Sequence, residues 1–244
     1  MTQSLRDELY SQEVVSPEKF KFDESVANVF EDMIKRSVPG YGMTLSLMPL
    51  IARRYGQENS KIYDLGCSLG AGMLALHAGL LKETKIIGVD NSQSMLDRCR
   101  QNLDQSMPKA TFELLHEDIL ETAISDASLV VMNFTLQFIA KEKRSSLLRR
   151  ICDGILPGGV FLLSEKIEFS DQCIQSEMMK LHHDFKKSQG YSELEISQKR
   201  DALENVLLPE SIETHKQRLA EAGFARSETW LQCFNFVSLI AFKD

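Results

Sequence analysis

The spacing of apolar positions predicts an alternation of helices and strands over the first two thirds of the chain. Residues 23–37 carry apolar side chains at helical spacing, with Asp23 as the candidate N-cap, and residues 43–55 predict a second helix. Further on, strands are expected over residues 60–64, 84–90, 110–118, 127–133 and 158–166, and helices over residues 71–81, 92–103 and 141–156. Strands that alternate with helices predict an α/β fold, a mostly parallel sheet with helices on both faces.

The alternation stops after residue 170. Residues 171–220 are helical in pattern throughout, and residues 224–244 form two β-rich runs that predict a closing hairpin. We therefore expect one α/β domain over residues 23–244, preceded by a flexible segment at residues 1–22. We expect residues 171–220 to be a helical insertion before the hairpin, serving as a lid or as a dimerisation surface.

Composition narrows the function classes. Of the 244 residues, 43% are hydrophobic and 26% are charged, which is typical of a globular protein. The net charge of −7 argues against direct binding of nucleic acid, so a small-molecule ligand is expected. We expect a cytoplasmic protein, because the chain has neither an apolar run that could cross a bilayer nor a recognisable leader. No metal is expected: the five cysteines are scattered, and adjacent His182 and His183 lack the spacing of a helical metal pair.

A glycine loop follows the first predicted strand, in Gly66-Cys-Ser-Leu-Gly70-Ala-Gly72. Its spacing matches neither the dinucleotide fingerprint nor a phosphate-binding loop. The form D-x-G-x-x-x-G looks like the first motif of class I S-adenosylmethionine (SAM)-dependent methyltransferases. Asp90, at the end of the second strand, is placed where an acid pairs with ribose hydroxyls. Two alternatives involve no ligand: the glycines would only allow a tight turn, and Asp90 would only cap its strand.

Other strand ends agree with a SAM site. By the same likeness, Asp118 and Ile119 would meet the adenine edge, and Asn133 would form the floor of the site below the sulfonium. The predicted hairpin also fits that fold, whose sheet has seven strands and a last strand that runs antiparallel. The segment from Asn133 to Phe138, NFTLQF, lacks the Asn/Asp-Pro-Pro-Tyr motif of amino-group methyltransferases.

Longer strings carry a more specific resemblance. The strings RSVPGY, YDLGCSLGA, VDNSQSML, NFTLQF, GYSELEISQKR and QCFNF occur along most of the chain. Together they resemble the carboxy-S-adenosyl-L-methionine synthases, a family with a Rossmann-like class I methyltransferase fold and a helical N-terminal extension. The resemblance implies a cytoplasmic homodimer that converts SAM and prephenate to carboxy-SAM and phenylpyruvate. It also implies a partner enzyme, a tRNA carboxymethyltransferase, that uses carboxy-SAM on wobble uridine.

The resemblance also implies a set of ligand contacts. The positions that match the family's motif are Tyr41, Gly66, Cys67, Ser68, Asp90, Asn91, Asp118, Ile119, Asn133 and Arg200. Arg200 is the candidate partner of the new carboxylate, because a guanidinium matches a carboxylate and keeps its charge, and Tyr41 is a candidate hydrogen-bond donor to the same group. Without the resemblance, Arg200 reads as a solvated surface charge.

Prephenate is a dianion, so further cations are expected near it. The candidates are Lys166, Lys199, His182 and His183, and the sequence does not rank them. Two other functions stay open. A conventional small-molecule methyltransferase would release S-adenosylhomocysteine, and a non-catalytic SAM-binding or tRNA-associated partner would bind without turnover.

Overall fold

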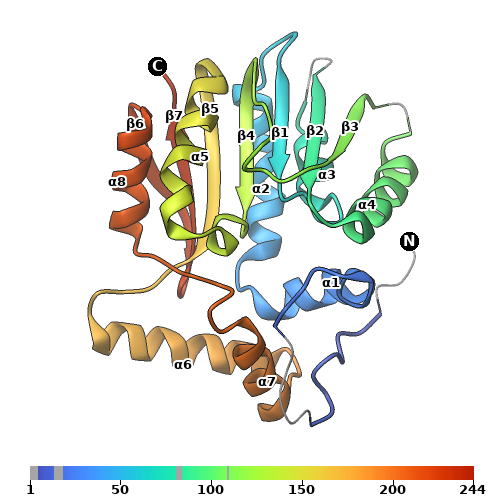
Figure 1. Ribbon diagram of the computed structural model, residues 1–244, viewed down its shortest axis with the longest axis vertical. Helices are drawn as coiled ribbons and strands as arrows, with labels where there is room; N and C mark the ends of the chain where they lie inside the picture. Colours follow the sequence, from blue (N-terminus) through green and yellow to red (C-terminus); the bar gives the residue numbers. More distant parts are fainter. Residues whose placement is uncertain (1–4, 14–18, 81–83, 109) are drawn as a thin grey trace.

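The computed structural model describes residues 5–13, 19–80, 84–108 and 110–244 and contains a seven-stranded sheet with helices on both faces (Figure 1). The strand order is β3-β2-β1-β4-β5-β7-β6. β7 pairs antiparallel with both of its neighbours, and the other pairs are parallel. The predicted fold class is therefore confirmed, including its antiparallel last strand. The strands are β1 (Lys61–Leu65), β2 (Lys85–Asp90), β3 (Phe112–His116), β4 (Ala127–Asn133), β5 (Ile155–Lys166), β6 (Arg226–Cys233) and β7 (Phe236–Phe242).

The helices agree with the predicted segments except at some ends. Asp23 caps the first helix as predicted, accepting a hydrogen bond from the Val26 backbone N–H. The second helix begins two residues earlier than predicted, at Tyr41, and the third ends at His77 rather than at residue 81. None of the described helices has the length and apolar character needed to span a bilayer. The helices are α1 (Glu24–Ser37), α2 (Tyr41–Tyr55), α3 (Ala71–His77), α4 (Gln93–Ser106), the 3-10 turn η1 (Leu136–Phe138), α5 (Lys141–Gly154), α6 (Gln172–Ser188), α7 (Glu193–Leu203) and α8 (Ile212–Ala222).

Two apolar layers hold the helices to the sheet. Residues of α2, α3 and α4 pack on one face, where Met48, Met73 and Leu103 are fully buried. Residues of α5 and α8 pack on the other face, and Leu148 and Leu219 are fully buried there. The helical segment at residues 171–220 is therefore divided. α8 belongs to the layer on the sheet, whereas α6 and α7 lie with α1 beyond the carboxyl ends of the parallel strands (Figure 1).

The N-terminal segment makes specific contacts with α7. Most of its described residues, 5–13 and 19–22, are exposed, and its contacts are carried by a few buried or half-buried groups. Asp7 is only 1% exposed, and Gln198 of α7 donates hydrogen bonds to the Tyr10 and Gln12 carbonyls at 2.9 and 2.8 Å. The Phe20 N–H also donates to the Ala202 carbonyl at 3.1 Å. The sequence pattern missed this packing because the contacts are mostly polar and leave no apolar periodicity.

A buried ion pair joins α5 to the segment before α8. Arg144 is fully buried, and its guanidinium pairs with Glu210 at 2.5 Å. It also donates to the carbonyls of Ile139 and Leu208 at 2.9 and 2.8 Å. Glu210 receives a second guanidinium from Arg218 at 2.7 Å. This network fixes the loop that carries the chain from α7 back to the sheet.

We expect the substitution Arg144→Met to lower the free energy of unfolding by about 3 kcal/mol. It would leave the buried oxygens of Glu210, Ile139 and Leu208 without the hydrogen bonds that Arg144 donates. Chemical denaturation with circular dichroism measures this loss. The control is Lys180→Met, which removes an exposed pair with Glu177 and should change stability by less than about 0.5 kcal/mol. A loss below about 1 kcal/mol for the Arg144 variant would contradict a structural role for the network.

Candidate active site

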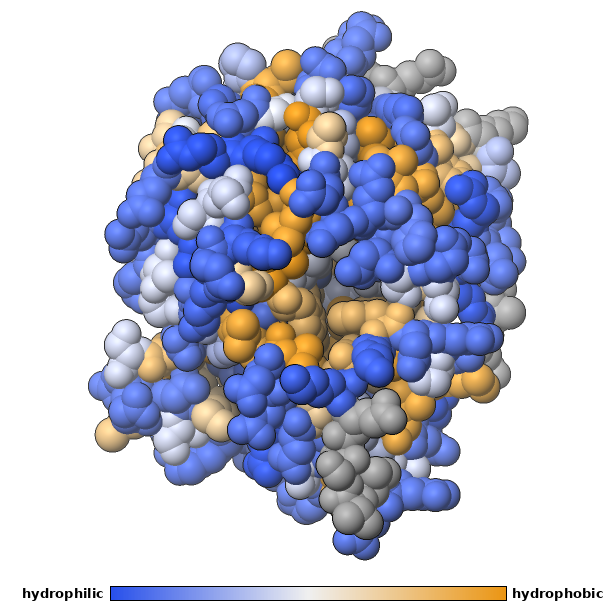
Figure 2. Space-filling view, viewed as in Figure 1, coloured by the Kyte–Doolittle hydropathy of each residue, from blue (hydrophilic) through white to orange (hydrophobic). Residues whose placement is uncertain are grey.

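A cavity of about 1340 Å³ lies at the carboxyl ends of β1, β2 and β4. The strand order reverses between β1 and β4, which is where open α/β sheets bind their ligands. α1, α6 and α7 contribute the opposite wall. Figure 2 shows the molecule hollowed between these two parts, with hydrophobic residues around the hollow.

The conformation of the loop after β1 allows a ligand to come close to its backbone. Gly66 has a φ of 81°, and a Cβ at this position would run into the side chain of Thr135. Ser68 also adopts a left-handed conformation, with a φ of 47°. Gly70 is the N-cap of α3 and has a φ of 83°, so the loop leads directly into the first turn of that helix. The loop therefore brings backbone, rather than side chains, against whatever the cavity holds.

Two acids flank this loop. The Asp90 carboxylate accepts from the Ser68 and Ser92 N–H groups, each at 2.9 Å. Asp64 is only 2% exposed, and burial, followed by the charge of Asp90, raises its pKa to about 7. A Cβ at Gly72 would overlap the Asp64 carboxylate, so only glycine leaves room for it. These acids favour a cationic or hydroxyl-rich ligand at the sheet edge.

All ten residues predicted for the site line this one cavity. They are Tyr41, Gly66, Cys67, Ser68, Asp90, Asn91, Asp118, Ile119, Asn133 and Arg200. Asn91 and Asp118 are exposed at its rim, whereas Ile119 and Cys67 are buried. Arg200 is on α7, and its side chain is 70% exposed, with Asp201 at 3.4 Å. Their individual roles in binding stay predictions.

The end of β4 forms the floor of the cavity. The Asn133 side chain is oriented by Ser164, whose hydroxyl donates to Asn133 Oδ1 at 2.8 Å. Phe134 follows in a left-handed conformation, with a φ of 56°. Its ring lies 6.3 Å from that of Tyr41, whose pKa burial raises well above its ordinary value. The Tyr41 phenol is therefore a hydrogen-bond donor rather than an anion.

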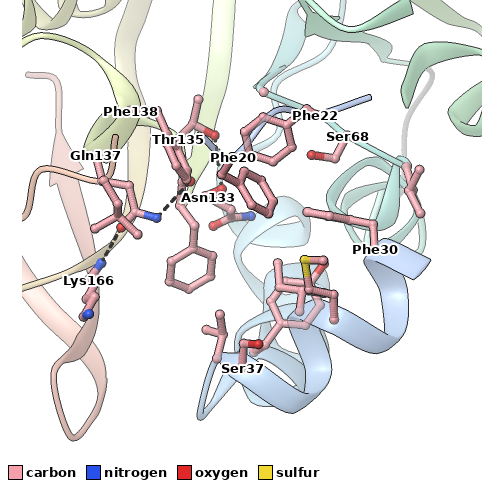
Figure 3. A pocket seen from close by; sticks show the side chains of 18 of the residues that line it. Phe20, Phe22, Phe30, Ser37, Ser68, Asn133, Thr135, Gln137, Phe138 and Lys166 are labelled. Atoms are coloured by element: carbon pink, nitrogen blue, oxygen red, sulfur yellow. Dashed lines mark hydrogen bonds between the residues drawn. The ribbon is translucent and has the colours of Figure 1, made fainter. Parts of the chain in front are cut away.

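Aromatic rings from distant segments cover the cavity. The ring of Phe22 lies 5.1 Å from Phe20, 6.1 Å from Phe30 and 5.3 Å from Phe138, all edge-on. Phe20 and Phe22 come from the N-terminal segment, Phe30 from α1 and Phe138 from η1. Figure 3 shows Phe20, Phe22 and Phe138 between Ser68 on one side of the cavity and Lys166 on the other, with Phe30 on the Ser68 side. The sequence analysis missed this cover, since isolated phenylalanines before a helix read as ordinary core.

A group of four cations lines the same cavity. It comprises Lys166 of β5, Lys186 of α6, and Lys199 and Arg200 of α7. Burial, and then the charges of the other three, lowers the pKa of Lys186 to about 8. Within the described part of the chain, no acid pairs with the ammonium group of Lys166 or Lys186. Two unneutralised cations beside a cavity favour an anionic ligand.

The four prephenate candidates differ in their environment. Lys166 lines the cavity, with its backbone N–H bonded to Gln137 Oε1 at 3.0 Å. Lys199 pairs with Asp7 at 3.3 Å, and His183 with Glu193 at 2.8 Å. His182 donates to the Ser37 carbonyl at 2.8 Å, and burial lowers its pKa to about 3, so it is neutral. Lys186 was missed because one lysine on an amphipathic helix reads as a surface charge.

The sheet order and the switch-point cavity define a class I methyltransferase fold. Residues 62–159 match the family model for a methyltransferase domain. Among solved structures, magnesium protoporphyrin IX methyltransferase from Synechocystis PCC 6803 with bound S-adenosylhomocysteine aligns with a TM-score of 0.61 at 14% identity, over 87% of each chain. That likeness shows the fold alone.

Comparison with relatives is more specific. The chain is 52% identical to a carboxy-S-adenosyl-L-methionine synthase of Hahella chejuensis, over 98% of both chains. It is 51% identical to the enzyme of the same name from Photorhabdus laumondii, over 98% of this chain and 95% of that one. The chain therefore belongs to the carboxy-S-adenosyl-L-methionine synthase family, which confirms the resemblance seen in its motifs.

We expect the substitution Gly66→Ala to weaken SAM binding at least about tenfold, because the added methyl displaces Thr135 and the loop with it. Isothermal titration measures the change. The matched control is Gly158→Ala: Gly158 also has a positive φ, of 76°, but its Cβ would meet only Gln57 Nε2 at 3.8 Å. Equal weakening by the two variants would mean that backbone strain, rather than crowding at the loop, explains the loss.

We expect the stability of the ligand-free protein to depend on Asp64 between about pH 4 and pH 7. The native carboxyl has a pKa of about 7 and its ordinary value is 3.8, so the native state holds the proton more tightly in this range. Stability should therefore fall as the pH rises, by at most about 4 kcal/mol from this group. Denaturant titrations at several pH values should show a shallower fall for Asp64→Asn than for the wild type. The control, Asp153→Asn on the exposed side of α5, should keep the wild-type slope.

Proposed function

We propose that this protein converts SAM and prephenate to carboxy-SAM and phenylpyruvate. We further propose that the product supplies a tRNA carboxymethyltransferase that builds uridine 5-oxyacetic acid at the wobble position. The observation that carries the proposal is the identity of about half of all residues, over nearly the full length, to carboxy-SAM synthases. The cation group in the cavity supports an anionic second substrate.

The proposed reaction balances without any further reactant. Prephenate loses its ring carboxylate as carbon dioxide and its ring hydroxyl as hydroxide, which leaves phenylpyruvate. The SAM methyl group loses one proton, hydroxide takes it to form water, and the methyl carbon bonds to carbon dioxide. No external oxidant, reductant or metal ion is needed for this balance. Carbon dioxide and hydroxide must both stay in the cavity, so water must be excluded while they form.

The acids and the cations of the cavity suit the two substrates. We assign the Asp90 carboxylate to the ribose hydroxyls of SAM and the loop from Gly66 to Ser68 to its amino acid portion. Asp118 and Ile119 would contact the adenine, and Asn133 would lie below the sulfonium. We assign Lys166 and Lys186 to the two carboxylates of prephenate, because they face the cavity without an acid partner in the described residues.

Arg200 and Tyr41 are assigned to the carboxylate of the product. The guanidinium of Arg200 keeps its charge, and the Tyr41 phenol keeps its proton because it is buried. Both groups line the same cavity as the SAM loop. The cover formed by Phe20, Phe22 and Phe138 would limit the entry of water over the reacting carbon.

The proposal includes a cytoplasmic homodimer that does not itself bind tRNA. Several large apolar side chains are exposed on α2, α6 and α7, and we assign them to a dimer interface. They are Met43 and Leu50 on α2, Ile174, Met179 and Leu181 on α6, and Leu194 on α7. The net charge of −7 is unfavourable for binding a polyanion.

We expect purified protein incubated with SAM and prephenate to yield a species heavier than SAM by one carbon dioxide, together with phenylpyruvate. Prephenate labelled with carbon-13 in its ring carboxylate should pass the label to the nucleoside product, as seen by mass spectrometry. Formation of S-adenosylhomocysteine alone would favour a conventional small-molecule methyltransferase. Binding of SAM without any product would favour a non-catalytic module.

The substitution Arg200→Met should lower carboxy-SAM formation at least about tenfold, since a charged hydrogen bond to a carboxylate is worth about 1.5–3 kcal/mol. The matched control is Arg226→Met, which removes another exposed arginine beside an aspartate, here Asp244 on the far edge of the sheet. Equal activities of the two variants would contradict the role of Arg200.

A further inference from the structure

An N-terminal strap, which we define as residues 5–13, lies against α1 and α7, and α7 carries two of the four cations. Asp7, a residue of this strap, is only 1% exposed, so its carboxylate is buried between the strap and the helices. It accepts a hydrogen bond from the Tyr191 hydroxyl and pairs with the Lys199 ammonium group at 3.3 Å. Lys199 immediately precedes Arg200 on α7. The strap therefore reaches the substrate wall of the cavity through one buried charge pair.

Asp7 is also tied to α1. Its N–H donates to Asp32 Oδ2 at 2.7 Å, and its carbonyl accepts from Arg36 Nη1 at 3.2 Å. The Arg36 guanidinium lies 3.8 Å from the centre of the Tyr191 ring and pairs with Asp32 at 3.1 Å. A second donor of Lys199 reaches Ser37 Oγ at 2.9 Å. Asp7 thus links the end of α1, the turn before α7 and α7 itself.

The attachment of α7 is unusually polar. Of its four buried residues, Ile196 and Ala202 are apolar, and Gln198 and Lys199 are polar. Both polar residues bond to the strap: Lys199 to Asp7, and Gln198 to the carbonyls of Tyr10 and Gln12. The apolar side chains of the strap itself contribute little, since Leu5 and Leu9 are 64% and 38% exposed. The orientation of α7 therefore depends on the strap more than on an apolar core of its own.

We propose that Asp7 is a positioning residue: through Lys199 and Tyr191 it holds α7 so that Arg200 faces the cavity. This inference rests on the proposed function for its catalytic consequence. Loss of the Asp7 charge would remove the ion-pair partner of the buried Lys199 ammonium group. α7 would then move to hydrate it, and Arg200 would move with α7. The SAM loop, which is built on β1 and β2, would keep its geometry.

The test compares full-length wild type with Asp7→Asn, which preserves side-chain shape and removes the charge. We expect kcat for carboxy-SAM formation to fall about tenfold or more, because Arg200 is assigned to the carboxylate of the product, while the dissociation constant for SAM stays within about twofold. The matched control is Glu8→Gln. Glu8 is the next residue, its side chain is 65% exposed, and its ion pair with Arg6 is long at 3.9 Å. This variant should behave as wild type.

A readout that needs no substrate separates this inference from the proposed function. Amide hydrogen exchange in Asp7→Asn should speed up over Glu193–Leu203 and stay unchanged over β1 and α3. Should the asparagine variant fail to fold, Tyr191→Phe tests the same role, because it removes the hydroxyl that donates to Asp7 without changing any charge, and it should speed up exchange over Glu193–Leu203 in the same way. Gln198→Met tests separately whether the rest of the strap contributes. It removes the donors to the Tyr10 and Gln12 carbonyls without changing any charge.

Two results would overturn the role of Asp7. One is unchanged exchange in α7, and the other is a loss of SAM binding equal to the loss of carboxy-SAM formation, which would indicate general destabilisation. If the wild type makes no carboxy-SAM from prephenate, the proposed function fails. The exchange experiment then still decides whether the strap holds α7.

Discussion

The reversal of strand order between β1 and β4 is the constraint on which the site depends. Because neighbouring helices leave the sheet on opposite faces there, the loops after β1 and β4 separate and leave a crevice between them. Gly66 and Thr135 are in contact across this crevice, so the two loops fix one another. The carboxyl ends of β1, β2 and β4 then bring Asp64, Asp90 and Asn133 to a single edge, although they are distant in the sequence.

The polar groups at that edge are oriented before any ligand arrives. Asp90 is held by two backbone N–H groups, and Asn133 is held by Ser164, which also bonds to Ser238 of β7 at 2.8 Å. The antiparallel last strand therefore supports the floor of the site from behind. Groups that are fixed by their own hydrogen bonds lose little freedom when a ligand binds, which favours both affinity and precise placement.

The part of the site at the strand ends was predicted well from the sequence. The part formed by α1, α6, α7 and the N-terminal segment was predicted poorly. Strand ends marked by Asp90 or Asn133 are visible because apolar runs stop there, and parallel strands align those ends in space. Lys186 and Asp7 have no such marker. Their importance comes from burial against α1 and α7, and burial through polar contacts leaves no periodic signal. For the same reason residues 1–22 read as flexible, although their described part carries a buried carboxylate.

Charge is divided across the cavity in a way that suits two substrates of opposite sign. Asp64 and Asp90 stand near the ends of β1 and β2, Lys166 stands at the end of β5, and Lys186 and Arg200 stand on the wall formed by α6 and α7. A sulfonium would be stabilised beside the acids and a dianion beside the cations, which orients the two substrates toward each other. An enzyme that only moved a methyl group to a neutral acceptor would have no need for these cations. Burial, and then repulsion from the neighbouring cations, lowers the pKa of Lys186, so the arrangement is unfavourable until an anion occupies it.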